Sequence, residues 1–451
     1  MKTLIKIFPV FKIIPVLLAS ILVYYILKAY LVTTFQKDYL TLVSGLLFCF
    51  YLYYMEVIRQ YPSFNVGRYL KPGFSIVNLI LAILLLALLY LGIKLGHTII
   101  AKANQFEASH DNLYTIISLS ACYQRFGLIK RGLMPTLVNF ASSKYNIQIY
   151  CAKLFGTIIF IGGIAAVAIS KLFSKFSRKI FIGIFLLAPV GIYCQFKFTG
   201  GAYDMAMIGF FFFATALNKR PGSLIFDVAG ILTHEAYLFL RLPFLLFNLY
   251  SRFTDKEKVK KPFAFELINL VVLCISFLLM SSNWVRPELA VLKSSYFLHY
   301  PNLPAPTAGD FHAFNPISKD VTFGYQMNLM HEYHQSKEFY TYIIPLFVCI
   351  IAMGLLSYFL SNLKGRQKTM DIFCSGITFL TPLLLSLIGT DIGRWLNFGF
   401  ISWACYYVLF RPVLFSGSRL SDNYLYAMLL ILLLFTPLGI FEQPLMSVLM
   451  K

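Results

Sequence analysis

Apolar runs of about twenty residues recur along the whole chain, and no other feature restricts its possible folds as strongly. A helix that crosses the hydrocarbon core of a bilayer needs about 20 mostly apolar residues. Eleven runs have this character, at residues 10–33, 39–57, 74–100, 147–169, 180–195, 203–217, 263–283, 340–361, 370–388, 395–412 and 424–445. The pattern predicts an all-α protein, a polytopic bundle of about 11–13 membrane-spanning helices that forms one domain over residues 1–451.

The charges agree with this prediction and argue against a nucleic-acid-binding protein. Only 13% of the residues are charged and 59% are hydrophobic, with a mean hydropathy of +0.72, whereas soluble domains carry about 25% charged residues. The net charge of +20 comes from Lys and Arg in short clusters between apolar runs, and such clusters favour the cytoplasmic side. We expect a multi-pass protein of the cytoplasmic membrane, in contact with membrane lipids, with an uncleaved first span and a cytoplasmic N-terminus.

Residues 223–250 differ from the other runs because polar residues interrupt them. The stretch contains the residues Asp227, His234, Glu235, Arg241 and Pro243. Basic clusters at 219–220 and 252–261 flank it on both sides, and a single crossing cannot place both of them in the cytoplasm. Two short or re-entrant helices that meet near 233–236 can do so, with Gly230 loosening the turn. His234 and Glu235 are then predicted at an outer apex.

Two long segments, 101–146 and 284–338, are predicted on the outer side of the membrane. The first has apolar residues at helical spacing, which suits a helix lying in the membrane interface: Leu113, Ile116, Ile117, Leu119, Cys122 and Tyr123. The second contains five prolines and is expected to form an ordered loop without regular repeats.

His234 and Glu235 are the strongest candidates for chemistry. Ionisable groups at membrane depth are costly, so they usually pair with one another or face a cavity. A Glu beside a His suits proton transfer, or the binding of a sugar hydroxyl or a cation. A structural alternative is a buried salt bridge of Glu235 or Asp227 with Arg241.

A second candidate is the outer turn that contains Asp391, Arg394 and Trp395. Arg binds anionic oxygens in a bidentate manner, and an adjacent indole suits a sugar face, so the turn fits a carbohydrate or a phosphate. An interfacial Trp beside a local Asp–Arg pair fits equally well. Asp204, near the outer start of a helix, is explained by the helix dipole, but it is expected at the same depth and is a further candidate.

The third candidate is a group of cations among glycines, formed by Arg125, Lys130 and Arg131 with Gly127 and Gly132. Glycine allows close approach of the backbone, and the cations suit a lipid-linked pyrophosphate. Contact with lipid headgroups is the alternative.

No metal or cofactor is indicated by the sequence. The segment His331-Glu332-Tyr333-His334 is not an HExxH motif, and its two histidines supply at most two ligands. We interpret them as surface residues; the sequence is compatible with a divalent metal but does not indicate one.

The layout resembles two related groups of bacterial envelope-glycan proteins, namely O-antigen or capsule polymerases and C-superfamily glycosyltransferases. The resemblance rests on the many spans, the long outer loops and three short motifs, Lys130-Arg131-Gly132-Leu133, His234-Glu235 and Asp391-Ile392-Gly393-Arg394. The first outer loop lacks the usual acidic motif of the C superfamily and offers only Lys37-Asp38, so Asp111 would have to serve.

The resemblance implies transfer of sugars from a polyprenyl-phosphate or -pyrophosphate carrier at the outer face of the cytoplasmic membrane. Arg125, Lys130, Arg131 and Arg394 would offset the charge of the leaving group. Glu235 or Asp391 would act as base, with His234 orienting or sharing the proton. The competing interpretation is a proton-coupled transporter or a flippase for lipid-linked glycans, with a site at the broken helix.

Overall fold

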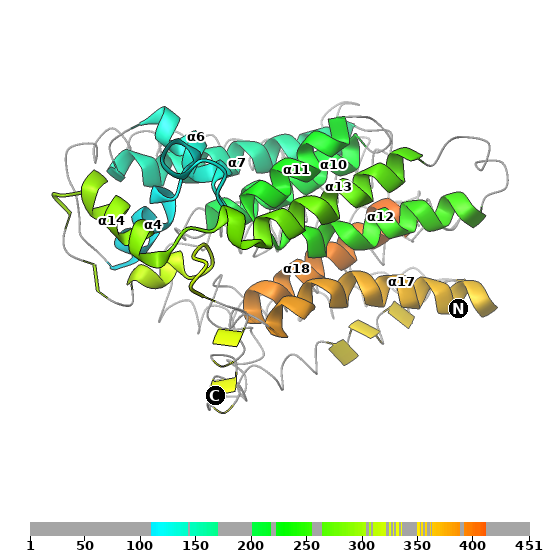
Figure 1. Ribbon diagram of the computed structural model, residues 1–451. Coiled ribbons are helices and arrows are strands. Elements are labelled where there is room, and N and C mark those ends of the chain that lie inside the picture. The colour runs from blue at the N-terminus through cyan, green and yellow to red at the C-terminus, as the bar shows by residue number, and fades with distance from the viewer. Residues whose placement is uncertain are drawn as a thin grey trace, which may run out of the picture.

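The computed structural model describes residues 110–142, 145–169, 201–217, 222–254, 264–303, 310–321, 363–387 and 392–411, with scattered positions between 306 and 361. Within these ranges the chain is helical and contains no strand, which confirms the all-α prediction for this part (Figure 1). Several predicted spans lie outside the described residues, namely 10–33, 39–57, 74–100, 180–195 and 424–445.

Two helices in the described part of the chain are long and apolar enough to cross a membrane. One comprises residues 147–164 of α7 (Tyr145–Ile169), and the other joins α17 (Gly365–Leu383) to the 3-10 turn η5 (Leu384–Leu387). A third candidate is a bent pair, Phe265–Ser281 and Asn283–His299, with an angle of 61° between its halves. The predicted spans at 147–169, 370–388 and 263–283 correspond to these helices, the last as one half of the bent pair.

Three other apolar helices near the centre are shorter than a full crossing, namely α10 (Gly201–Ala216), α11 (Gly222–Thr233) and α12 (Tyr237–Thr254), whose apolar part ends at Tyr250. Helix α18 (Ile392–Cys405) continues as a π-helical turn over Tyr406–Phe410. In Figure 1, α7, α10, α11 and α13 (Ala264–Ser281) run side by side, and α17 and α18 lie below them.

Glycines let α7 and α10 pack with their backbones in contact. A Cβ atom on Gly163 of α7 would lie 2.5 Å from the carbonyl oxygen of Gly209 in α10, and one on Gly209 would lie 2.5 Å from that of Ile159. Any side chain at either position would therefore force the helices apart. Close packing through small residues is typical of helices in membranes, where no hydrophobic force brings them together.

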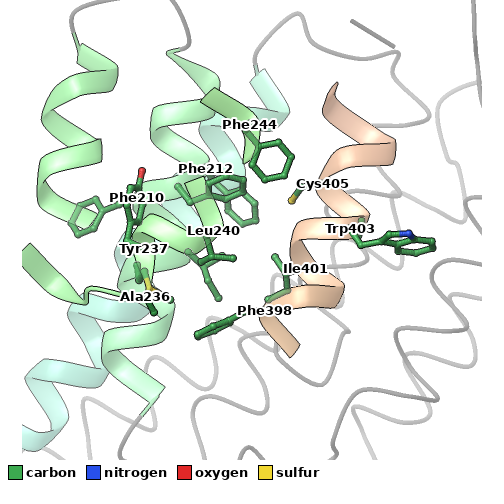
Figure 2. Close-up of a cluster of buried hydrophobic side chains, with 14 of the residues drawn as sticks. Phe210, Phe212, Ala236, Tyr237, Leu240, Phe244, Phe398, Ile401, Trp403 and Cys405 are labelled. Atoms are coloured by element: carbon green, nitrogen blue, oxygen red, sulfur yellow. The ribbon is translucent and has the colours of Figure 1, made fainter. Parts of the chain in front are cut away.

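Aromatic and aliphatic side chains fill the space between α10, α12 and α18. Figure 2 shows Phe398, Ile401 and Cys405 on one face of α18, directed toward Leu240 and Phe244 of α12. Trp403 points away from this cluster, and its indole nitrogen donates a hydrogen bond of 3.1 Å to the Ser357 hydroxyl. The core therefore ties α18 to α12, the helix that follows His234 and Glu235.

Large apolar side chains also remain exposed along one stripe of α13 and one of α17. On α13 they are Leu267, Ile268, Val271, Ile275, Leu278 and Leu279, and on α17 they are Phe373 and Leu380, followed by Leu384 and Leu387 of η5. A helix that buries one face in protein and exposes a second apolar face suits contact with lipid rather than water.

The two predicted outer segments pack against each other around one small core. It joins α4 (His110–Ser120), α14 (Leu289–His299) and the 3-10 helix η4 (Asp310–Phe314), which lie together at one end of the molecule (Figure 1). Ile116 and Ile117 of α4 are fully buried there. The helix at this position is confirmed, but its apolar face is covered by protein, which corrects the expectation that this face lies in the membrane interface.

Candidate functional site

The helical break expected at residues 233–236 is present, because α11 ends at Thr233 and α12 begins at Tyr237. The helices fold back on each other through Asp227 of α11, which accepts hydrogen bonds from the Tyr237 hydroxyl (2.5 Å) and from Nε of Arg241 (2.9 Å). All three side chains are buried. The buried salt bridge that was the structural alternative therefore forms between Asp227 and Arg241. Glu235 does not take part in it and contacts other residues.

Gly230 serves this fold in a way that differs from the expected one. It lies inside α11, where a Cβ atom would meet the Tyr237 ring at 2.3 Å. Its role is thus to admit the Tyr237 ring against α11 rather than to loosen the turn. This contact brings the Tyr237 hydroxyl to Asp227 and fixes the direction of the turn that carries His234 and Glu235.

Glu235 is held by two cations from a distant segment. Arg131 binds it in a bidentate manner, with Nε 2.8 Å from Oε2 and Nη2 2.5 Å from Oε1, and Nζ of Lys130 lies 3.2 Å from Oε1. Bidentate Arg–carboxylate pairs are among the strongest side-chain hydrogen bonds. Glu235, from the first candidate in the sequence, and Lys130 and Arg131, from the third, therefore lie in one cluster.

The turn that carries these two cations has an unusual backbone. Arg131 has a φ of 58°, in the left-handed region that few residues other than glycine adopt. The amide of Lys130 donates a hydrogen bond of 3.3 Å to the Val285 carbonyl, which attaches the turn to the segment 284–338. Helix α6 (Leu133–Ala141) begins directly afterwards, with Gly132 as its N-cap. Backbone strain of this kind is found preferentially at functional sites.

His234 carries its hydrogen on Nε2. The Ala236 amide donates a 3.0 Å hydrogen bond to Nδ1, so Nδ1 holds the lone pair and Nε2 of the neutral ring holds the hydrogen. This Nε2 lies 3.3 Å from Nη2 of Arg394, which is also a donor. Two donors lie side by side at this point, and a ligand oxygen within reach of both nitrogens would accept from both.

Arg394 is oriented by Asp204. Its Nε lies 2.8 Å from Oδ2 of Asp204, and its Nη2 donates to Oδ1, which joins the first turn of α18 to that of α10. The guanidinium carbon lies 5.1 Å from the centre of the Trp395 ring. Because the indole is buried and Arg394 covers it, Trp395 forms the wall behind the guanidinium in this structure and is not presented as an open surface for a sugar.

The electrostatics of the cluster favour an ionised glutamate and a neutral histidine. Burial alone would raise the pKa of the Glu235 carboxyl, but Arg131 and Lys130 outweigh it and hold that pKa well below its ordinary value. Burial and the charge of Arg131 lower the pKa of His234 well below its usual range. Burial also lowers the pKa of the Lys130 ammonium group, and Glu235 opposes that shift.

Arg286 belongs to this region and was missed in the sequence. Its Nη2 donates to the carbonyl oxygens of Ser318 and of Val321, the latter at 2.9 Å. Burial lowers the pKa of its guanidinium, and the charge of Glu235 opposes this shift. Its position just before Pro287 was the available signal, because a residue before proline is confined to extended conformations. Arg286 has φ −122° and ψ 108°, as this rule requires.

The remaining candidates lie apart from the cluster or outside the described residues. Arg125 donates to Asn139 (3.4 Å) and to the Tyr300 hydroxyl (3.3 Å), and no described contact joins it to Glu235. Asp111 lies in α4, and its side chain is not described. Asp391 is outside the described residues.

Metal ligands do not gather in the part of the chain that the structure describes. No group of three or more His, Cys, Asp or Glu side chains there could hold a metal ion. The exposed ring of His331 instead lies 3.0 Å from the Gln335 amide nitrogen, one helical turn onward.

No family model, curated protein or solved structure matches this chain. The residues of the cluster provide the Glu235 carboxylate, a neutral imidazole with an Nε2–H donor, and four cations, one of which, Arg394, is paired with Asp204. These groups come from segments that are far apart in the sequence. Such a group can bind an anionic oxygen and place a carboxylate beside it.

Proposed function

We propose that this protein is a membrane glycosyltransferase or polysaccharide polymerase that uses sugars linked to a polyprenyl phosphate or diphosphate at the outer face of the cytoplasmic membrane. The observation that carries the proposal is the contact of Glu235 with Arg131 and Lys130, next to His234 and Arg394. A glycosyl transfer from such a donor needs cations for the phosphate and a base for the hydroxyl, and this cluster contains both.

The proposed reaction is a displacement at the anomeric carbon of the donor sugar. The acceptor oxygen forms a bond to that carbon, and the bond from the carbon to the phosphate oxygen breaks with its electron pair leaving on the lipid phosphate. The proton of the acceptor hydroxyl passes to the Glu235 carboxylate. Lys130 and Arg131 stabilise the negative charge that develops on the phosphate.

His234 and Arg394 orient substrate oxygens in this scheme. The Nε2–H of His234 and the Nη2 group of Arg394 are two donors 3.3 Å apart, so they suit one hydroxyl or phosphate oxygen. Asp204 fixes the guanidinium by two hydrogen bonds, which reduces the entropy lost when the substrate binds.

The exposed apolar stripes of α13 and α17 support a location in the membrane, where a polyprenyl chain is soluble. The basic loops predicted on the opposite side favour an outward orientation of the cluster. A lipid-linked donor could then approach from the bilayer while its phosphate reaches Lys130 and Arg131.

Two buried carboxylates, Asp227 and Asp371, do not suit the proton coupling that the transporter interpretation requires. Asp227 is held by Arg241 and Tyr237, and Asp371 accepts from Nε of Arg411 (2.9 Å to Oδ2) and from the Tyr406 hydroxyl (2.8 Å to Oδ1). Both carboxylates are fully buried. A carboxylate that couples transport to protons has to exchange its partner and its solvation, whereas these two are fixed by an Arg and a Tyr each.

The test is genetic and biochemical. In a deletion strain of the organism that carries the gene, we expect loss of an envelope glycan and accumulation of its lipid-linked precursor on the outer face. The wild-type gene should restore the glycan and Glu235→Gln should not, although the variant reaches the membrane. Glu288→Gln is the matched control, because Glu288 is an exposed carboxylate that pairs with Lys319. Unchanged glycans in the deletion strain, with altered uptake of a solute, would refute the proposal.

A further inference from the structure

Glu235 differs from the neighbouring Asp227–Arg241 pair because solvent or a ligand can reach it. Its side chain is 17% exposed and that of its partner Arg131 is 22% exposed, whereas Asp227 and Arg241 are both at 0%. It also lies in a turn between two helices, so its movement requires no helix to unwind. A pair of this kind can open, and the Asp227 pair cannot.

The groups around Glu235 are those that bind a phosphate. A planar guanidinium and an ammonium meet at its two oxygens, in the same arrangement by which Arg and Lys hold phosphoryl oxygens. Arg286 adds a third positive charge, and its buried Nε–H has no hydrogen-bond partner among the described residues. Asp320 also acts on Arg286, so these three cations stand against two carboxylates, Glu235 and Asp320.

We propose that Lys130, Arg131 and Arg286 form a diphosphate subsite, and that Glu235 occupies this subsite until a lipid-linked diphosphate displaces it. This inference rests on the proposed function. It adds a description of the site before the ligand binds, when Glu235 holds the cations. The carboxylate is the resident anion, and the incoming phosphate takes over its hydrogen bonds.

Displacement also explains how Glu235 becomes a base. In the contact with Arg131 and Lys130 its pKa is held well below the ordinary value, and such a carboxylate accepts a proton poorly. Once the phosphate neutralises these cations, that depression is relieved. The site would then gain its base only after the donor has bound, which protects the donor from premature hydrolysis.

Binding of farnesyl diphosphate to the full chain in phosphatidylcholine nanodiscs tests the proposal without any transfer reaction. Glu235→Gln removes the competing anion, so we expect its affinity for farnesyl diphosphate to rise by about tenfold, the factor that corresponds to one charge-assisted hydrogen bond. Arg131→Gln should lower the affinity by about tenfold or more for the same reason. Farnesol should bind equally to all variants, because it lacks the phosphates.

Glu288→Gln is the matched control, since it removes one negative charge two residues from Arg286 without touching the subsite. An equal rise in affinity for this variant would show a general charge effect and overturn the proposal. An unchanged or reduced affinity of Glu235→Gln would overturn it as well. If Glu235→Gln fails to fold, Glu235→Asp retracts the carboxylate by one methylene and should raise the affinity less, in the same direction; no rise in that variant counts against the proposal.

Two further arms separate the sources of the anion. Inorganic pyrophosphate should compete with farnesyl diphosphate, and phosphatidylglycerol in the nanodisc should not. Competition by phosphatidylglycerol that increases in Glu235→Gln would assign the subsite to bilayer headgroups and overturn the proposal. The binding results are independent of glycan synthesis: a tenfold rise in affinity in a protein whose deletion changes no glycan would retain the subsite and reject the glycosyltransferase.

Discussion

Replacement of Gly230 by Ala should destabilise the protein although alanine is the better helix former. The added Cβ would lie 2.3 Å from the Tyr237 ring, which is completely buried and has no room to retreat. Overpacking of this kind costs about 1 to 3 kcal/mol. Displacement of the ring also breaks the 2.5 Å hydrogen bond from the Tyr237 hydroxyl to Asp227, and a hydrogen bond to a charged group contributes about 1.5 to 3 kcal/mol.

Against these losses stands the gain in helix propensity, about 1 kcal/mol for Gly to Ala. The net expectation is a destabilisation of about 2 to 5 kcal/mol. Gly376 in α17 offers a matched control, because a Cβ at that position would meet nothing within 4 Å. Gly376→Ala should therefore stabilise the protein by about 0.5 to 1 kcal/mol.

The assay is thermal denaturation of the purified variants in the same detergent. The measured quantity is the fraction of protein that remains monodisperse after heating to each temperature. We expect Gly230→Ala to lose several degrees and Gly376→Ala to gain a little. Equal stability of the two variants, or a more stable Gly230→Ala, would refute the reasoning and show that Tyr237 does not fill the space beside Gly230.

Three other variants test the charged groups. Asp371→Asn leaves the buried Arg411 without its counter-charge and should destabilise the protein by about 3 to 5 kcal/mol in the same thermal assay. Arg394→Lys cannot form both bonds to Asp204, so we expect a folded protein with glycan synthesis reduced at least about tenfold, measured by complementation of the deletion strain. His234 has a lowered pKa when folded, so the unfolded chain binds more protons below pH 6.5 and stability falls as the pH decreases through this region. His234→Asn should remove that part of the pH dependence, and an unchanged slope between about pH 6.5 and pH 5 would contradict the assignment.

The helical fold follows from local patterns. Apolar runs long enough for a bilayer predict helices at 147–169 and 370–388, and the described helices α7 and α17 with η5 lie there. The break near 233–236 could also be predicted, because two basic flanks cannot both be cytoplasmic around one crossing. In these cases the information is contained in a short stretch of sequence.

The sequence was less informative about which faces are covered. The apolar side of the helix at 110–120 has a spacing that suits a membrane interface equally well as a protein core. The second outer segment decides between them, because α14 and η4 supply the other half of that core. A pattern within one helix does not reveal what lies opposite to it.

The sequence alone determined that this chain is rich in apolar helices and that ionisable side chains interrupt them, because both properties depend on composition and spacing. Only the tertiary structure decided which charges meet. Arg131 and Glu235 are 104 residues apart, and Arg394 and Asp204 are 190 apart, so no local pattern selects these pairs over a local Asp391–Arg394 pair or one between Glu235 and Arg241. The packing of α10 and α18 against α12 brings Arg394 to Asp204, and the attachment of the turn before α6 to Val285 places Arg131 beside Glu235.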